Sequence, residues 1–183
     1  MTPGSDVMTW GVHWLDMFHC WAPEHKAITV MGQIDVERQM LTGHKEFVED
    51  ALLGHITYDN GMRAIIECGD IAQLEPGFPA HATIRAYGPK GRFEANDIGY
   101  KLSLGDFYEH NPVSSPFEQS DYQMWVDQAK ELIQCIEQNK EHQCNGYAGR
   151  KTIEITCAIW ESARSHRLIH IPFESAESPL DTF

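Results

Sequence analysis

The residues of this sequence best suited to chemistry lie near its start, between residues 9 and 21. His13 and Asp16 stand three residues apart there, so on a helix their side chains could hydrogen-bond or face one cavity. A carboxylate beside an imidazole fixes its tautomer and raises its basicity, as a general base requires. The alternative is a buried, satisfied polar pair with a structural role, which is the commoner use of such residues.

A metal site is not expected in this segment. His13 and His19 are six residues apart and fall on different faces of a helix, and no nearby cysteine pair has the spacing of a ligand pair. A metal-dependent hydrolase built on His13 and Asp16 would also lack a third ligand at a sensible spacing. The sequence therefore predicts no metal ion at these residues. It leaves two uses for His13 and Asp16: proton transfer, or a structural role without chemistry.

The same segment is predicted to be a buried amphipathic helix that positions His13. Apolar side chains recur in it at spacings of three and four and form one stripe: Trp10, Trp14, Met17, Phe18 and Trp21. Residues 27–34 follow as a strand rich in β-branched side chains, and residues 35–50 are polar enough to be an exposed loop.

A hairpin is the clearest element of the first half, because Asn60-Gly61 separates two apolar runs at 52–58 and 62–68. With Asn60 and Gly61 as a two-residue turn, Tyr58 pairs with Arg63, and neither face of the hairpin is cleanly polar. This predicts a sheet with helices on one side and a domain or subunit on the other. A twisted sheet with scattered exposed aliphatic residues is the alternative.

The rest of the chain alternates strands with two later helices. A second hairpin is expected at 82–87 and 92–95, a strand at 98–104, a long surface loop at 105–117, a helix from 120 to 136 with Gln123 completing a capping box, a helix at 148–165 apolar nearly all round, and a short edge strand at 168–172. Strands followed by helices predict an α+β fold, an open and largely antiparallel sheet with helices on one face. We expect one domain over residues 1–173 and a polar tail over 174–183.

The composition excludes several partners. With 14 basic and 27 acidic residues the formal charge is -13, which repels nucleic acids and anionic membranes alike. The five scattered cysteines do not have the spacing of a disulfide framework, and no apolar run is long enough to span a membrane. The first Lys or Arg is Lys26, whereas a signal peptide begins with a basic segment. We expect a cytoplasmic protein with free thiols.

Four segments together resemble the C-terminal half of a known family, the NAD(P)-dependent sugar and polyol dehydrogenases of the glucose-fructose oxidoreductase, inositol dehydrogenase and MocA family. The run Trp10-Gly11-Val12-His13-Trp14-Leu15-Asp16 resembles the motif that opens the helix at the family's active site. The hairpins at 53–61 and 84–93, and the closing segment 153–172, resemble later parts of the same domain in the same order.

The resemblance implies that His13 is the catalytic histidine, which takes a hydroxyl proton while hydride leaves the same carbon. It places Thr9, Trp10 and Asp16 beside the substrate. Many members of the family carry an aspartate where this sequence has Thr9. A hydroxyl can bind a sugar by hydrogen bonds but cannot supply that carboxylate's charge.

The family's nucleotide-binding segments are not found in this sequence. No glycine-rich turn joins a strand to a helix, and the family's Glu-Lys-Pro segment is missing, so we expect the N-terminal Rossmann domain to be absent and NAD or NADP to bind only where such a domain is supplied. The leading hypothesis is the substrate-binding half of an oxidoreductase, inactive alone, acting on a sugar or polyol and assembling as a homo-oligomer through its sheet. The alternative is a non-catalytic oligomerisation or sugar-binding module.

Overall fold

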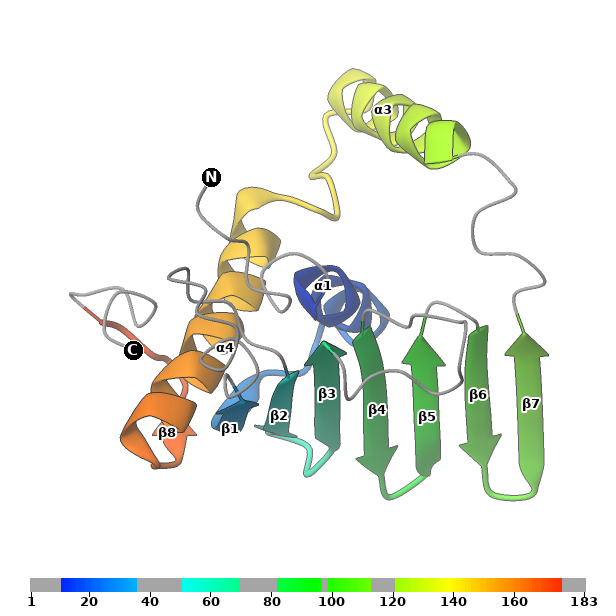
Figure 1. Ribbon diagram of the computed structural model, residues 1–183. Helices are drawn as coiled ribbons and strands as arrows, with labels where there is room; N and C mark the ends of the chain where they lie inside the picture. Colours follow the sequence, from blue (N-terminus) through cyan, green and yellow to red (C-terminus); the bar gives the residue numbers. More distant parts are fainter. Residues whose placement is uncertain (1–10, 36–50, 70–81, 97–98, 113–120, 176–183) are drawn as a thin grey trace, which may run out of the picture.

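The chain folds around one open sheet of eight strands, seen in a computed structural model that describes residues 11–35, 51–69, 82–96, 99–112 and 121–175 (Figure 1). The strand order is β7-β6-β5-β4-β3-β2-β1-β8, and every neighbouring pair is antiparallel. Helices α1 and α4 lie against one face of this sheet, and α3 stands apart from it (Figure 1). The predicted α+β class is therefore confirmed.

The strands are β1 (Ala27–Asp35), β2 (Ala51–Tyr58), β3 (Arg63–Gly69), β4 (Ala82–Gly88), β5 (Gly91–Asn96), β6 (Gly99–Leu104), β7 (Phe107–Pro112) and β8 (Ile169–His170). The helices are α1 (Val12–Trp21), α3 (Asp121–Glu137) and α4 (Gly146–Ser165). The predicted loop at 35–50 lies almost wholly outside the described residues, and so does Ser120 at the start of the predicted capping box.

The β2–β3 hairpin exists, but its predicted register is wrong by one residue. Thr57, not Tyr58, pairs with Arg63. The Tyr58 amide donates to the Met62 carbonyl at 2.9 Å, which leaves a loop of three residues, 59–61, that Gly61 closes at a φ of 80°. A left-handed glycine at the end of a three-residue loop is a favoured hairpin geometry. The slip sorts the side chains cleanly: even-numbered residues of β2 and β3 face the helices, and odd-numbered residues face the other way.

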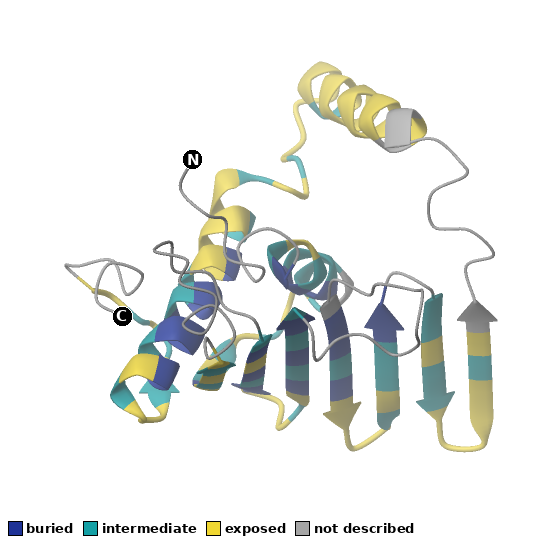
Figure 2. Ribbon diagram, viewed as in Figure 1, coloured by how far each residue is buried: buried dark blue, intermediate teal, exposed yellow. Residues whose placement is uncertain are grey.

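The core lies between the helices and the middle of the sheet (Figure 2). Its members are apolar residues of α1, β1 to β5 and α4, among them Leu15, Ile56, Ile66, Ile84 and Trp160. Helix α4 approaches β1 so closely that a Cβ at Gly32 would stand 2.2 Å from the carbonyl oxygen of Ile159. Only glycine fits there, and the Gly32 amide donates to the Ser162 hydroxyl at 2.9 Å.

Two further expectations need correction. The predicted loop at 105–117 contains an edge strand, β7, which pairs with β6 across a tight turn at Gly105-Asp106. The polar residues of this segment and Pro112 led to the prediction of a loop, but an edge strand tolerates both polar residues and proline. Helix α4 is not buried on every side, as its apolar residues nearly all round suggested: Ile155 and Ile159 are buried, whereas Ile153 is exposed.

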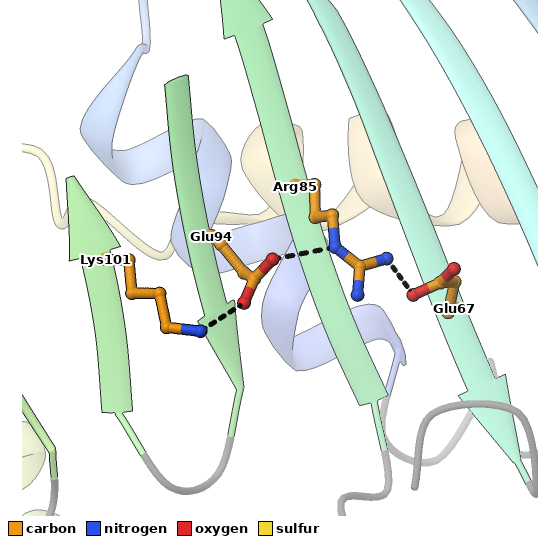
Figure 3. A network of polar contacts seen from close by, with 4 residues as sticks. All are labelled: Glu67, Arg85, Glu94 and Lys101. Carbon is orange, nitrogen blue, oxygen red and sulfur yellow. Dashed lines mark hydrogen bonds and ion pairs between the residues drawn. The ribbon is translucent and has the colours of Figure 1, made fainter. Parts of the chain in front are cut away.

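The face of the sheet opposite the helices carries a row of alternating charges (Figure 3). Arg85 pairs with Glu67 on β3 and with Glu94 on β5 at 2.8 Å, and Lys101 on β6 pairs with Glu94 at 3.2 Å. Partial burial alone would raise the pKa of Glu94, but hydrogen bonds from Arg85 and Lys101 lower it overall. The row, named here the charge ladder, compensates its own charges across four strands.

The described residues of helix α3 are nearly all exposed (Figure 2), and apolar side chains among them form a stripe that faces solvent. The stripe consists of Trp125, Val126, Leu132, Ile133 and Ile136, each between 43% and 71% exposed. A stripe of this size at helical spacing is typical of a surface that packs against something else. Among the described helices, none is both long and apolar enough to span a membrane.

Candidate functional site

Helix α1 sets the positions of the predicted site residues. Leu15 and Phe18 anchor it in the core, which turns His13 outward to solvent and leaves Asp16 half-buried. Thr9 and Trp10, the other two predicted substrate-binding residues, lie outside the described part of the chain. The structure therefore places two of the four predicted site residues.

His13 and Asp16 line one small hollow of about 250 Å³ between α1 and the start of α4. Cys144, Asn145 and Thr152 complete much of its wall. Within the described residues the hydrogen-bond partner of Asp16 is Thr152, whose hydroxyl donates to Oδ1 at 3.3 Å. From sequence, His13 and Asp16 could either hydrogen-bond to each other or face one cavity. In the structure they face one cavity, and the Asp16 carboxylate accepts its hydrogen bond from Thr152.

His19, which was not among the predicted site residues, lies at the centre of a polar chain that includes Asp16 and Thr152 from the wall of this hollow. Its Nε2 is 3.3 Å from the Tyr58 hydroxyl and its Nδ1 is 3.4 Å from the Thr152 hydroxyl. Burial lowers the pKa of His19, although the Asp16 carboxylate opposes the shift. A neutral imidazole protonated on Nδ1 satisfies every contact: Tyr58 donates to it, and it donates to Thr152, which donates to Asp16.

This polar chain joins three elements that are distant in sequence. Tyr58 comes from β2, His19 and Asp16 from α1, and Thr152 from α4. Burial raises the pKa of Tyr58, so its hydroxyl keeps the proton that it donates. The only local signal for this arrangement was the three-residue spacing of Asp16 and His19 on one helix face. Nothing in the sequence indicated that Tyr58 and Thr152 are hydrogen-bond partners of His19, because both lie far from it along the chain.

A larger cavity of about 520 Å³ lies beside the hollow and shares Asp16 and Asn145 with it. Lys26, Lys151 and Glu154 bring charges of both signs to its wall. The cavity is formed by α1, the start of β1 and the first half of α4. Its size suits a small molecule.

The described residues offer no cradle for a dinucleotide. Such a cradle needs a glycine-rich turn between a strand and a helix in a parallel sheet. Here the strand pairs are antiparallel, and the glycine-containing turn at 88–91 joins β4 to β5. The part of the chain that the structure describes therefore does not fit NAD or NADP by itself.

Comparison with known proteins decides the family. Residues 4–171 match the model of an oxidoreductase family, described as its C-terminal alpha/beta domain. The chain belongs to the glucose-fructose oxidoreductase, inositol dehydrogenase and MocA family. It is an oxidoreductase C-terminal domain, and the resemblance noted in the sequence is confirmed.

Solved structures share the fold of this C-terminal domain at low sequence identity. The aldose-aldose oxidoreductase from Caulobacter crescentus, complexed with glycerol, is 20% identical, with a TM-score of 0.65 over 92% of this chain and 48% of that one. An oxidoreductase from Agrobacterium radiobacter, in complex with NAD+, L-tartaric acid and magnesium, is 15% identical, with a TM-score of 0.65 over 90% and 48%. Levoglucosan dehydrogenase in complex with NADH is 15% identical, with a TM-score of 0.65 over 89% and 49%.

The chain thus spans about half the length of these structures of the family. None of the curated proteins matches the sequence.

Proposed function

We propose that this domain forms the substrate side of an NAD(P)-dependent oxidoreductase that oxidises a hydroxyl group of a sugar or polyol. The observation that carries the proposal is the position of His13 in a domain of this family. It stands exposed on the first helix and lines a hollow with Asp16 and Thr152. An imidazole there can reach a substrate held against the helix.

In the proposed reaction His13 takes the proton from the substrate hydroxyl as a general base. An exposed imidazole can accept the proton of a hydroxyl group that is held beside it. Asp16 is held by Thr152 and belongs to the wall of the site, so we give it the role of positioning and substrate contact. Thr9 and Trp10, which precede α1 in the chain, are proposed as further substrate contacts.

Hydride acceptance is assigned to a nicotinamide cofactor bound by a nucleotide-binding domain, because the described residues hold no cradle for it. Helix α3 supports this pairing. Its apolar stripe, with Trp125 67% and Ile136 71% exposed, needs a covering surface that the described chain does not provide. We propose that the nucleotide-binding domain covers α3.

The test titrates the chain with NADH and NADPH and follows quenching of its tryptophan fluorescence. We expect no saturable quenching up to millimolar cofactor for the chain alone. Addition of the nucleotide-binding half of the Caulobacter relative should then give cofactor reduction with at least one compound in a panel of aldoses and polyols. Saturable quenching by the chain alone would contradict the assignment of the cofactor. So would a complex of the two halves that turns over no substrate in the panel.

A second role is favoured by the open face of the sheet, which we propose packs against a second copy of the chain. Met31 and Leu53 on this face are 52% and 37% exposed, and Tyr87 is 40% exposed. They flank the charge ladder, whose charges are already paired within one chain. Burial of this face in a dimer would therefore remove apolar groups and already paired charges from water. It would leave none of the four charged groups of the ladder without a partner.

Sedimentation velocity tests this assembly. We expect a dimer for the natural sequence and a monomer for Met31→Glu, because a new carboxylate within an interface would be desolvated without a partner. The control is Leu104→Glu on β6, at a position 46% exposed on the face of the sheet opposite Lys101 and the charge ladder. That variant should stay dimeric, and a natural chain that sediments as a monomer would refute the proposal.

A further inference from the structure

Three side chains that bind metals well meet at the junction of α1 and α4. The ligand atoms of Asp16, Cys20 and Cys144 all lie within 4.8 Å of one another. Asp16 and Cys20 are four residues apart on α1 and so share one face of the helix, and Cys144 reaches them from the segment that leads into α4. None of the three has been used in the proposed proton chemistry as a reacting group.

We propose that Asp16, Cys20 and Cys144 form a binding site for a divalent cation of the zinc type. Two sulfur donors and one carboxylate select a borderline or soft metal over magnesium or calcium, which prefer oxygen ligands throughout. Three protein ligands leave one position of a zinc tetrahedron for water, and the adjacent hollow is open to receive it.

The geometry is close to what the metal needs. With Zn–S near 2.3 Å and Zn–O near 2.1 Å, neighbouring ligand atoms of a tetrahedral site stand about 3.6 to 3.8 Å apart. The observed separations of up to 4.8 Å therefore require only small side-chain rotations. Asp16 and Cys20 are half-buried and Cys144 is exposed, so a hydrated ion can reach the site.

The backbone that carries Cys144 is held in place. Asn145 caps α4 by accepting hydrogen bonds from the amides of Tyr147 and Ala148 at 2.9 Å, and its own amide donates to Glu141 at 2.7 Å. The Cys144 amide donates to His142 at 3.1 Å. The third donor is thus presented by an ordered segment, and a bound ion would fasten α1, with His13 on it, to the start of α4.

A disulfide between Cys20 and Cys144 is the competing use of the two thiols. The carboxylate decides against it, because Asp16 has no part in a disulfide and its charge opposes the thiolate that must attack. A dication uses all three groups and removes the repulsion among them. The metal also suits a chain whose formal charge is -13.

The experiment titrates the full chain, reduced and stripped of metal, with Co²⁺ under anaerobic conditions. Thiolate ligation gives a charge-transfer band in the near ultraviolet, and tetrahedral coordination gives intense bands in the visible range. We expect saturation at one equivalent, displacement by Zn²⁺, and a rise in the thermal midpoint when Zn²⁺ is added. Neither readout depends on a cofactor or on oxidoreductase activity.

Variants locate the site. Cys144→Ser, at an exposed position that packing does not constrain, should lose about half of the charge-transfer intensity and bind at least about tenfold more weakly. Asp16→Asn should weaken binding while keeping the sulfur band. Cys135→Ser on α3 is the control and should match the natural chain. Absence of the band, its full retention in Cys144→Ser, or recovery of Cys20 and Cys144 as a disulfide from reducing buffer would each overturn the proposal.

Discussion

Replacement of His13 by alanine is expected to lower the turnover number about a hundredfold or more once a nucleotide-binding domain is supplied. General-base catalysis by a positioned side chain contributes roughly 10² to 10⁴ in rate. His13 is exposed, so its truncation opens no cavity in the core and should leave folding intact. Cofactor affinity should stay near that of the natural chain, because the cofactor is assigned to the other domain.

Chemical rescue separates a lost base from a disturbed helix. A small exogenous base such as imidazole should restore part of the rate of His13→Ala. His110→Ala, an exposed histidine on β7, is the matched control and should turn over like the natural chain. An unchanged turnover number in His13→Ala would remove this residue from the mechanism.

The strands were predictable because their signals are local. β-Branched content marked residues 27–34, and Asn60-Gly61 marked the first hairpin. The register error shows the limit of such signals. Asp59-Asn60-Gly61 is compatible with a two-residue turn at Asn60-Gly61 and with a three-residue loop that ends at a left-handed Gly61, and one residue of slip exchanges the two faces of the sheet. The face that points away from the helices is nevertheless mixed, as predicted, because it carries Leu53 and Ile65 beside His55 and Glu67.

Only the part of the site that lies on one helix could be predicted from the sequence. His13, Asp16 and His19 share α1, and spacing along a helix tells which of them are neighbours. Their partners come from elsewhere: Thr152 is 136 residues from Asp16, and Tyr58 is 39 residues from His19. For the same reason the cysteines read as scattered, since only the packing of α4 against α1 brings Cys144 to Cys20.

Trp160→Ala is expected to cost about 3 to 5 kcal/mol of unfolding free energy. Trp160 is 1% exposed, on the face of α4 that packs into the core. Its truncation leaves a void between the helix and the sheet that close-packed neighbours fill only in part. Domains of this size unfold at a cost of about 5 to 15 kcal/mol, so the variant loses a large share of its stability.

Urea unfolding followed by far-ultraviolet circular dichroism measures this loss without relying on the removed fluorophore. The midpoint should fall sharply at an unchanged dependence on urea concentration. Trp125→Ala on α3, where the side chain is 67% exposed, is the matched control and should change stability by less than about 0.5 kcal/mol in the isolated chain. The same Trp125→Ala variant should weaken association with a nucleotide-binding domain if that domain covers the stripe on α3. Equal urea midpoints for the two tryptophan variants would contradict the packing of α4 on the sheet. A normal midpoint for Trp160→Ala together with a lowered midpoint for Trp125→Ala would mean that α3 is the buried helix.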